Sequence, residues 1–385
     1  MAKNITGRPG LYVHIPYCDT KCAYCDFYSI TRQDSRAGFI PALIREIQSY
    51  GREPYTTRPF DTIYFGGGTP SLLSPGELEQ ILEALHQTFP IHSGCEITLE
   101  ANPGTIGPEK LKAFKSLGVN RLSMGVQSFD DTDLKALGRI HSARQAVQSF
   151  SEARQAGFDN ISLDLIFALP GQTLGRWELN LQRIRALAPE HISAYNLIYE
   201  EGTLFHRWRE EGKIKPAPDI LEQKLYETTI GALEKAGYIL YEVSNFARGE
   251  QYYSRHNSKY WDHTPYLGFG PSAHSYWPEQ RWSNIRSATG YNRQIEAGES
   301  VVRFKEQLDD ETRMFETVML GLRTRAGIDL KRFTGRFHSG FDTLFGHQTE
   351  ELIRGGFARF EDDHFRLTAK GLMICDEIIP HFHHG

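Results

Sequence analysis

Six short apolar segments that alternate with amphipathic helical patterns constrain the fold of this chain more than any other feature. They lie at about 10–16, 61–65, 96–100, 121–126, 161–169 and 191–197. Amphipathic helical patterns occupy about 35–50, 75–89, 108–117, 143–156 and 174–187. Apolar strands alternating with helices predict a parallel sheet, and right-handed connections curl such a sheet into a barrel. Six units are too few for a closed eight-stranded barrel. The sequence therefore predicts an α/β fold, a partial (β/α)6 barrel, with an open doubly wound sheet as the alternative.

The pattern changes after the sixth unit. A helix is predicted at 219–236 and a strand at 238–243, after which aromatic, Gly, Ser and Asn residues dominate without a clear period. We expect three regions: a barrel over 1–240, an aromatic-rich stretch of loops and short strands over 241–307 that closes the barrel's open side, and a small domain over 308–385. In the last, three helical patterns precede a hairpin and a final helix, which predicts a winged-helix-like α+β unit.

Composition excludes several classes of partner. The 385 residues carry a formal net charge of −5, so no basic surface for nucleic acid is expected, and the small domain is expected to pack or dock rather than bind DNA. No run of about 18 apolar residues is present, so we expect no membrane span. The first residues lack the apolar core of a signal peptide, which favours a cytoplasmic location.

Three of the five cysteines stand close together, as C-D-T-K-C-A-Y-C from Cys18 to Cys25, directly after the first strand. Three thiolates can hold a metal centre while leaving one coordination position open, as a catalytic centre requires. A zinc site would need a fourth ligand, for which His14 is near, but the paired C-x2-C spacing is missing. An open iron–sulfur centre on Cys18, Cys22 and Cys25 is the prediction.

Other polar residues end the predicted strands, where barrel enzymes build their active sites. The run Gly66-Gly67-Gly68-Thr69-Pro70 lets backbone approach a ligand closely, although a tight turn is the simpler interpretation. Glu100 and Gln127 end the third and fourth strands, and Asp164 lies inside the fifth. Because a carboxylate in an apolar strand is costly unless paired, Arg139 is expected to pair with Asp164 or with a carboxylate ligand.

The cysteine loop resembles that of the radical S-adenosylmethionine (radical SAM) superfamily. The ordered motifs L-Y-V-H-I-P-Y-C, F-G-G-G-T-P, T-L-E-A-N-P, G-V-Q-S-F and D-L-I-F-A-L-P-G-Q-T are similar to those of the oxygen-independent coproporphyrinogen III oxidase group, over essentially the whole chain. The resemblance implies a four-iron, four-sulfur (4Fe-4S) cluster on the three cysteines. It further implies that S-adenosylmethionine is contacted by Tyr12, Gly67 and Glu100. The positions that hold a second S-adenosylmethionine in the true oxidases are matched by Gly68, Thr69, Gln127, Arg139 and Asp164.

Two departures separate this chain from the true oxidases. Phe27 stands where those enzymes carry a fourth cysteine, and only about ten residues precede the first strand. Both departures, and the motif H-N-x-x-Y-W from His256 to Trp261, resemble the radical SAM heme chaperones, which bind heme and deliver it to respiratory proteins. A neutral imidazole is a common heme ligand, so His256 is the expected axial ligand, unless His256 and Asn257 only tie down a loop.

The functional prediction is therefore a heme chaperone whose partners are heme and heme-accepting proteins. The alternatives are an oxygen-independent coproporphyrinogen III oxidase and a radical SAM enzyme acting on another substrate, so enzymatic activity is left open. A homodimer and a peripheral attachment to the membrane through a partner are compatible with the prediction.

Overall fold

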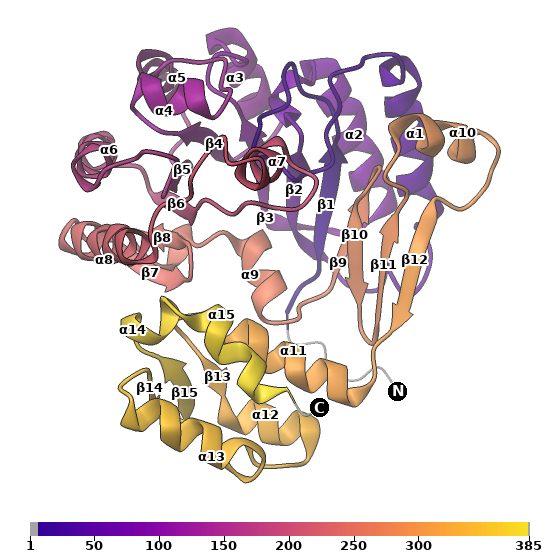
Figure 1. Ribbon diagram of the computed structural model, residues 1–385. Coiled ribbons are helices and arrows are strands. Elements are labelled where there is room, and N and C mark those ends of the chain that lie inside the picture. The colour runs from indigo at the N-terminus through magenta and orange to yellow at the C-terminus, as the bar shows by residue number, and fades with distance from the viewer. Residues whose placement is uncertain (1–6, 384–385) are drawn as a thin grey trace.

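Six parallel strands form the wall of a partial barrel in the computed structural model, which describes residues 7–383 (Figure 1). The strands pair in chain order, each parallel to the next. They are β1 Gly10–Ile15, β2 Phe60–Gly67, β3 Ile91–Ala101, β4 Arg121–Gln127, β5 Ile161–Phe167 and β6 His191–Asn196. All six were predicted, although β3 begins five residues earlier than expected because its first half is polar and half exposed.

Helices cover the outer face of the barrel wall (Figure 1). They are α1 Arg36–Ser49, α2 Pro75–Thr88, α3 Pro108–Ser116, α5 Ala143–Gln155, α6 Leu174–Leu187 and α8 Asp219–Lys235. The beginnings of α2 and α5 are determined locally, since Ser74 and Ser142 each form a reciprocal capping box with the residue three positions on. Two short helices were not predicted, α4 Asp131–Ala136 and α7 Leu204–Glu210.

Strand alternation separates the core from the barrel interior. Leu99, Leu122 and Leu163 are fully buried in the main hydrophobic core. Glu100 and Ser123, the next residues on β3 and β4, are paired in register and line a cavity inside the barrel. The same strands therefore supply an apolar face to the helices and a polar face to the site.

The aromatic-rich region is more regular than predicted. After β7 Ile239–Glu242 it forms β8 Asn245–Ala247, α9 Arg255–Trp261, β9 Tyr266–Phe269, β10 His274–Trp277, β11 Gln280–Asn284, α10 Ala288–Glu296 and β12 Val302–Gln307. These strands extend one 12-stranded sheet at both edges, with β8 beside β6 and β9 beside β1. Strands of three to six residues are too short to show a clear period, which explains the missed assignment.

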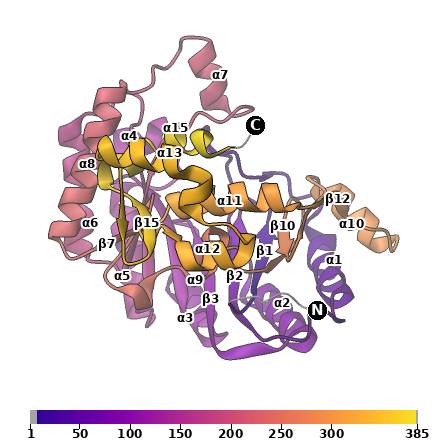
Figure 2. The same cartoon turned by 90° about the horizontal axis from the view of Figure 1, so that it is seen from below.

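The small C-terminal domain lies below the amino-terminal ends of the barrel strands, and the view from below shows its helices in front of them (Figure 2). Its antiparallel sheet has three strands, one more than the predicted hairpin, because Ile328–Asp329 form an additional short strand. Phe333, Phe341, Phe345, Phe365 and Phe382 form the aromatic centre of this domain. Its elements are α11 Asp310–Leu322, β13 Ile328–Asp329, α12 Leu330–Phe337, α13 Phe341–Arg354, β14 Ala358–Glu361, β15 His364–Leu367, α14 Ala369–Leu372 and α15 Cys375–Ile378. Across residues 7–383, no helix has both the length and the apolar character needed to cross a bilayer.

Candidate functional site

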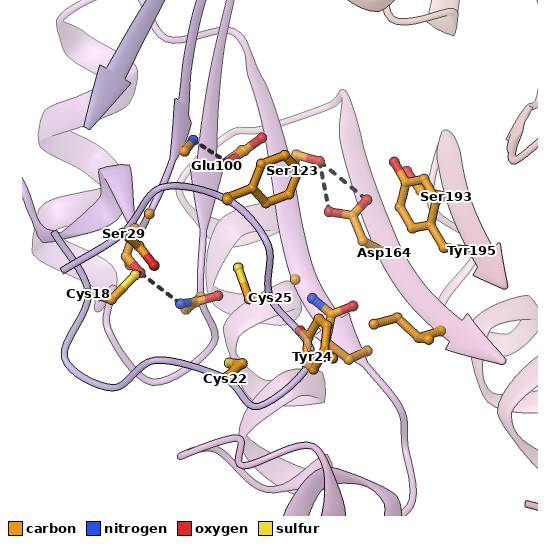
Figure 3. A pocket seen from close by; sticks show the side chains of 18 of the residues that line it. Cys18, Cys22, Tyr24, Cys25, Ser29, Glu100, Ser123, Asp164, Ser193 and Tyr195 are labelled. Atoms are coloured by element: carbon orange, nitrogen blue, oxygen red, sulfur yellow. Dashed lines mark hydrogen bonds between the residues drawn. The ribbon is translucent and has the colours of Figure 1, made fainter. Parts of the chain in front are cut away.

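The three clustered cysteines lie on the loop between β1 and α1, above the carboxyl-terminal ends of the barrel strands (Figure 1). Cys18, Cys22 and Cys25 line one cavity of about 460 Å³ that reaches into the barrel interior. Figure 3 shows them around the cavity, opposite Asp164 and Tyr195. The loop is anchored by two backbone hydrogen bonds, from Cys18 N to Ile30 O at 3.0 Å and from Ile30 N to Pro16 O at 2.7 Å.

The chemistry of the loop fits an iron–sulfur cluster. Burial raises the pKa of the Cys18 thiol and raises that of Cys25 to about 11, so bound metal charge is needed to hold both as thiolates. Ser29 lines the same cavity, and its buried hydroxyl lies within hydrogen-bond distance of no polar group among residues 7–383. Within residues 7–383, no three His, Cys, Asp or Glu side chains converge on one ion. A cluster does not require such convergence, because each of the three cysteines forms its own iron–sulfur bond to a different iron.

Gly67 is the residue of the glycine run that the backbone geometry requires most strongly. Its φ is +111°, and an added Cβ would lie 2.5 Å from Cε1 of His14. The Gly67 amide donates to Glu100 Oε2 at 3.2 Å, and the Tyr64 hydroxyl donates to Glu100 Oε1 at 2.8 Å. Burial raises the pKa of Glu100 to about 7, and the nearby carboxylate of Asp164 contributes to the increase. Glu100 can therefore accept hydrogen bonds from a hydroxyl- or amino-bearing ligand in the cavity.

A chain of hydrogen bonds connects the glycine motif to two of the cysteines. Thr69 donates to Cys18 Sγ at 3.3 Å and accepts from Asn102 Nδ2 at 3.1 Å. Arg139 donates to Asn102 Oδ1 at 2.7 Å and to Cys22 Sγ at 3.4 Å. Asn102 was not among the predicted site residues, although it follows Glu100 in T-L-E-A-N-P.

Asp164 does not pair with Arg139, which corrects one of the two roles expected for that arginine. The carboxylate of Asp164 accepts a hydrogen bond from Ser123 at 3.0 Å (Figure 3). It accepts another from Ser162 at 3.0 Å. Burial raises the pKa of Asp164, opposed by its serine hydrogen bonds and by the charge of Arg121. The residues around Asp164 that were not predicted are two serines and the buried Arg121. They belong to no recognisable motif.

His256 is placed differently from what its predicted role requires. It is 1% exposed, its Nδ1 bonds Thr62 Oγ1 at 2.9 Å, and its Nε2 bonds the Tyr260 hydroxyl at 3.0 Å. Because both ring nitrogens are engaged, His256 offers none to heme iron, and the expectation of an axial ligand is corrected. The alternative, in which this residue ties down the local structure, agrees with the geometry.

The structure gathers ten of the predicted site residues in the cluster cavity. Tyr12 lies outside it: its ring stacks on Tyr64 and His256, and its hydroxyl bonds His14 Nδ1 at 3.0 Å. The cavity-lining residues among those predicted are Cys18, Cys22, Cys25, Gly67, Gly68, Thr69, Glu100, Gln127, Arg139 and Asp164. These residues, with a backbone turn at Gly67 that excludes a side chain, suit a nucleoside-sized ligand beside the cysteine loop.

Comparison with known proteins identifies the family. Residues 12–184 match the radical SAM superfamily and residues 308–374 match the HemN C-terminal domain. The chain is 36% identical to the heme chaperone HemW of Bacillus subtilis (strain 168), over 96% of this chain and 98% of that one. It is also 36% identical to the mitochondrial radical S-adenosyl methionine domain-containing protein 1 of Bos taurus, over 97% and 86% of the two chains.

The fold is also that of a solved structure. Coproporphyrinogen III oxidase (HemN) from Escherichia coli, a radical SAM enzyme, matches with a TM-score of 0.84 and 24% identity, over 98% of this chain and 90% of that one. This match confirms the partial barrel and its C-terminal domain. Taken with the full-length similarity to HemW, it shows that the chain belongs to the HemW heme chaperone family of the radical SAM superfamily.

Proposed function

We propose that this protein binds heme and delivers it to heme-accepting proteins. The observation that carries the proposal is the 36% identity to HemW over nearly the full length of both chains. The cysteine loop supports it, because Phe27 occupies the position at which the true oxidases carry a fourth cysteine, and its side chain is 69% exposed.

The cysteine loop and the barrel interior have distinct tasks in this proposal. Cys18, Cys22 and Cys25 hold a 4Fe-4S cluster, which when bound supplies one-electron chemistry toward S-adenosylmethionine. Glu100 and the Gly67 backbone orient that ligand, and Arg139 stabilises thiolate charge at Cys22. The loop covers the cavity and limits access of water to it.

Delivery of heme requires a surface on which an acceptor docks. Phe27 and Ile198 line the mouth of the cluster cavity, and Ile198 is 63% exposed. Exposed apolar side chains at the mouth of a site favour a protein partner. We place acceptor docking at this rim, so that heme passes to the acceptor without crossing bulk water.

The oxidase alternative keeps one supporting observation. Gln127, Arg139 and Asp164, which match the second S-adenosylmethionine site of the true oxidases, all line the cavity. An anaerobic assay with a reductant, S-adenosylmethionine and coproporphyrinogen III tests it. We expect no decarboxylated product, and formation of that product at a rate typical of enzymes would make this chain an oxidase.

Heme binding is tested by anaerobic reconstitution of the cluster followed by titration with hemin. We expect a saturable Soret band at about one heme per chain, with an affinity well above that of an unrelated protein of similar size. A linear, unsaturable absorbance would contradict the proposal.

The proposal also covers the location and the assembly of the protein. We place the protein in the cytoplasm, with a homodimer and peripheral membrane attachment through a partner as its working states. Light scattering at two protein concentrations, with and without the cluster, tests the dimer. Flotation with membranes that contain or lack the acceptor tests the attachment, and a protein that floats with acceptor-free membranes would contradict attachment through a partner.

A further inference from the structure

A second chamber opens beside the cluster cavity, at the open side of the partial barrel. It has a volume of about 610 Å³, within the range of about 300–1,000 Å³ typical of ligand sites. One wall comes from β1, β9 and β10, and the other from the β7–β8 turn at residues 242–245. α9 lies between these walls (Figure 1). Phe27, Tyr195 and Asn257 line both the chamber and the cluster cavity, so the two spaces adjoin.

The surface of the chamber suits a flat apolar macrocycle. Aromatic rings line it from three separate parts of the chain, namely the cluster loop, α9 and β9. Such rings offer large apolar faces to a planar ligand. The chamber-lining aromatics on these elements are Phe27, Tyr28, Tyr260, Trp261 and Tyr266. The H-N-x-x-Y-W motif thus contributes Asn257, Tyr260 and Trp261 to the chamber, while its histidine is turned away.

Two histidines line the chamber, and they differ in whether a ring nitrogen is free. His14 bonds the Tyr12 hydroxyl through Nδ1 at 3.0 Å and the Tyr28 carbonyl through Nε2 at 2.8 Å. His274, at the start of β10, is exposed, and in the described part of the chain no hydrogen bond engages its ring. His274 is therefore the imidazole in this chamber that can bind a metal ion without breaking an existing hydrogen bond.

Arg286 is the one arginine among the chamber-lining residues in the described part of the chain, and it lies in the loop between β11 and α10. It donates to the Asp26 carbonyl at 2.8 Å, lies 3.6 Å from the Asp26 carboxylate and has an exposed side chain. Glu242 lies on the opposite wall, where its carboxylate accepts from the Ser244 amide at 3.0 Å. A carboxylate of a dicarboxylate macrocycle would compete with Asp26 for Arg286 and would avoid Glu242, because guanidinium groups bind carboxylates strongly.

From this arrangement we infer that the chamber is the heme site, with His274 as an axial ligand of the iron and Arg286 as a partner of a propionate. This inference rests on the proposed heme-chaperone function and deepens it by naming the site. It places heme beside the cluster cavity, with Phe27 of the cluster loop on the boundary between the two.

The test is a hemin titration of the full-length, cluster-reconstituted protein and its His274→Ala variant. We expect the variant to bind about tenfold more weakly or worse, with a shifted Soret band, since even the outer partners of metal ligands contribute about 10–100-fold. Free imidazole should restore the original spectrum in His274→Gly. His347→Ala, which removes an exposed histidine of the C-terminal domain, serves as the matched control and should leave both affinity and spectrum unchanged.

The role of Arg286 has its own readout. Arg286→Gln should weaken hemin binding about threefold without shifting the Soret band, because an exposed charged contact contributes little to affinity. Heme dimethyl ester, which has no carboxylates, should bind the native protein and Arg286→Gln equally.

The outcomes distinguish the site from the function. If the native protein binds hemin and His274→Ala matches it in affinity and spectrum, the assigned site is wrong while the heme function stands. If the native protein shows no saturable binding, the proposed function fails and the site fails with it.

Discussion

The two ends of the barrel differ in whether their buried polar side chains have partners within the protein. At the amino-terminal end, His256 has both ring nitrogens bonded, and Asp61 pairs with Lys259 at 2.7 Å and Arg255 at 3.2 Å. At the carboxyl-terminal end, the buried Ser29 hydroxyl has no polar group within hydrogen-bond distance in the described part of the chain, and the thiols of Cys18 and Cys25 face a cavity.

The difference separates groups that stabilise the fold from groups that serve ligands. In a parallel sheet the two ends of the strands can have these two roles. The loops at the carboxyl-terminal end can change in sequence to bind a ligand without disturbing the core. The H-N-x-x-Y-W motif has both roles: His256 is buried at the amino-terminal end of the barrel, whereas Tyr260 and Trp261 line the second chamber.

The largest expected effect is the loss of iron in Cys22→Ala. This residue lies on the loop and contributes little to the core, so iron after reconstitution should fall to near background while the circular dichroism spectrum stays native. Cys95→Ala is the matched control, because Cys95 is buried in β3. It should keep its iron and lose about 1 kcal/mol of stability through a small cavity. Global unfolding of Cys22→Ala would mean that the cluster also stabilises the fold.

At the amino-terminal end, Asp61→Ala should reduce the free energy of unfolding by about 3 kcal/mol. The change leaves Lys259, which is 7% exposed at its side chain, without its counter-charge. Asp376→Ala breaks an exposed pair with Arg323 and should cost less than about 1 kcal/mol. Chemical denaturation measures both, and equal losses would show that the buried Asp61 pair stabilises the fold no more than an exposed pair of the C-terminal domain does.

Gly67→Ala should affect both stability and ligand binding. The positive φ and the contact with His14 predict a loss of about 1–3 kcal/mol, together with weaker binding of S-adenosylmethionine to the reconstituted protein. Gly76→Ala is the control, since Gly76 lies in α2 with open space around an added Cβ. Calorimetry should find Gly76→Ala neutral or slightly stabilised. A Gly67→Ala variant that binds S-adenosylmethionine normally would contradict the role given to this turn.

The smallest expected effect is on the pH dependence of stability in Glu100→Gln. Burial raises the pKa of Glu100 to about 7, so the folded state holds this proton more tightly than the unfolded state. The stability from this proton is complete below about 4.5 and is lost as the pH rises through about 7. Glu46 and Glu242 titrate in the same window.

Thermal unfolding of the cluster-free chain from pH 4.5 to 8 measures this effect. Compared with the native protein, Glu100→Gln should lose less stability as the pH rises from about 4.5 to about 7. Buried histidines whose pKa is lowered, such as His14 and His256, also shape the curve, but they contribute equally to both proteins. Glu109→Gln changes an exposed glutamate of α3 and is the control. An unchanged slope in Glu100→Gln would show that this carboxyl does not take up a proton in the folded chain.

The parts of the molecule that could be predicted are those determined by residues adjacent in the sequence. The strands β1 to β6 are short apolar runs, and the cysteines and Gly67 stand in contiguous motifs whose spacing is itself the constraint. The resemblance to a known family then extended these motifs to Glu100, Gln127 and Arg139.

Other features depend on contacts that no local pattern reports. Asn102 and Ser123 are small polar residues whose roles follow from the register of β3 and β4. His274 is more than 200 residues from the cluster loop and reaches the same region because β9 pairs with β1. The position of His256 could not be deduced from its motif, since only the fold shows that Thr62 and Tyr260 occupy its nitrogens.

The most direct test of the central claim is the rate at which heme passes from the loaded protein to a heme-free acceptor. A heme-free cytochrome from the same organism is the acceptor, and heme-free myoglobin is the scavenger control. If this protein delivers heme, the observed rate rises with cytochrome concentration and does not depend on myoglobin concentration. A rate equal for both acceptors and independent of their concentrations would show simple release into solution, and would contradict the account.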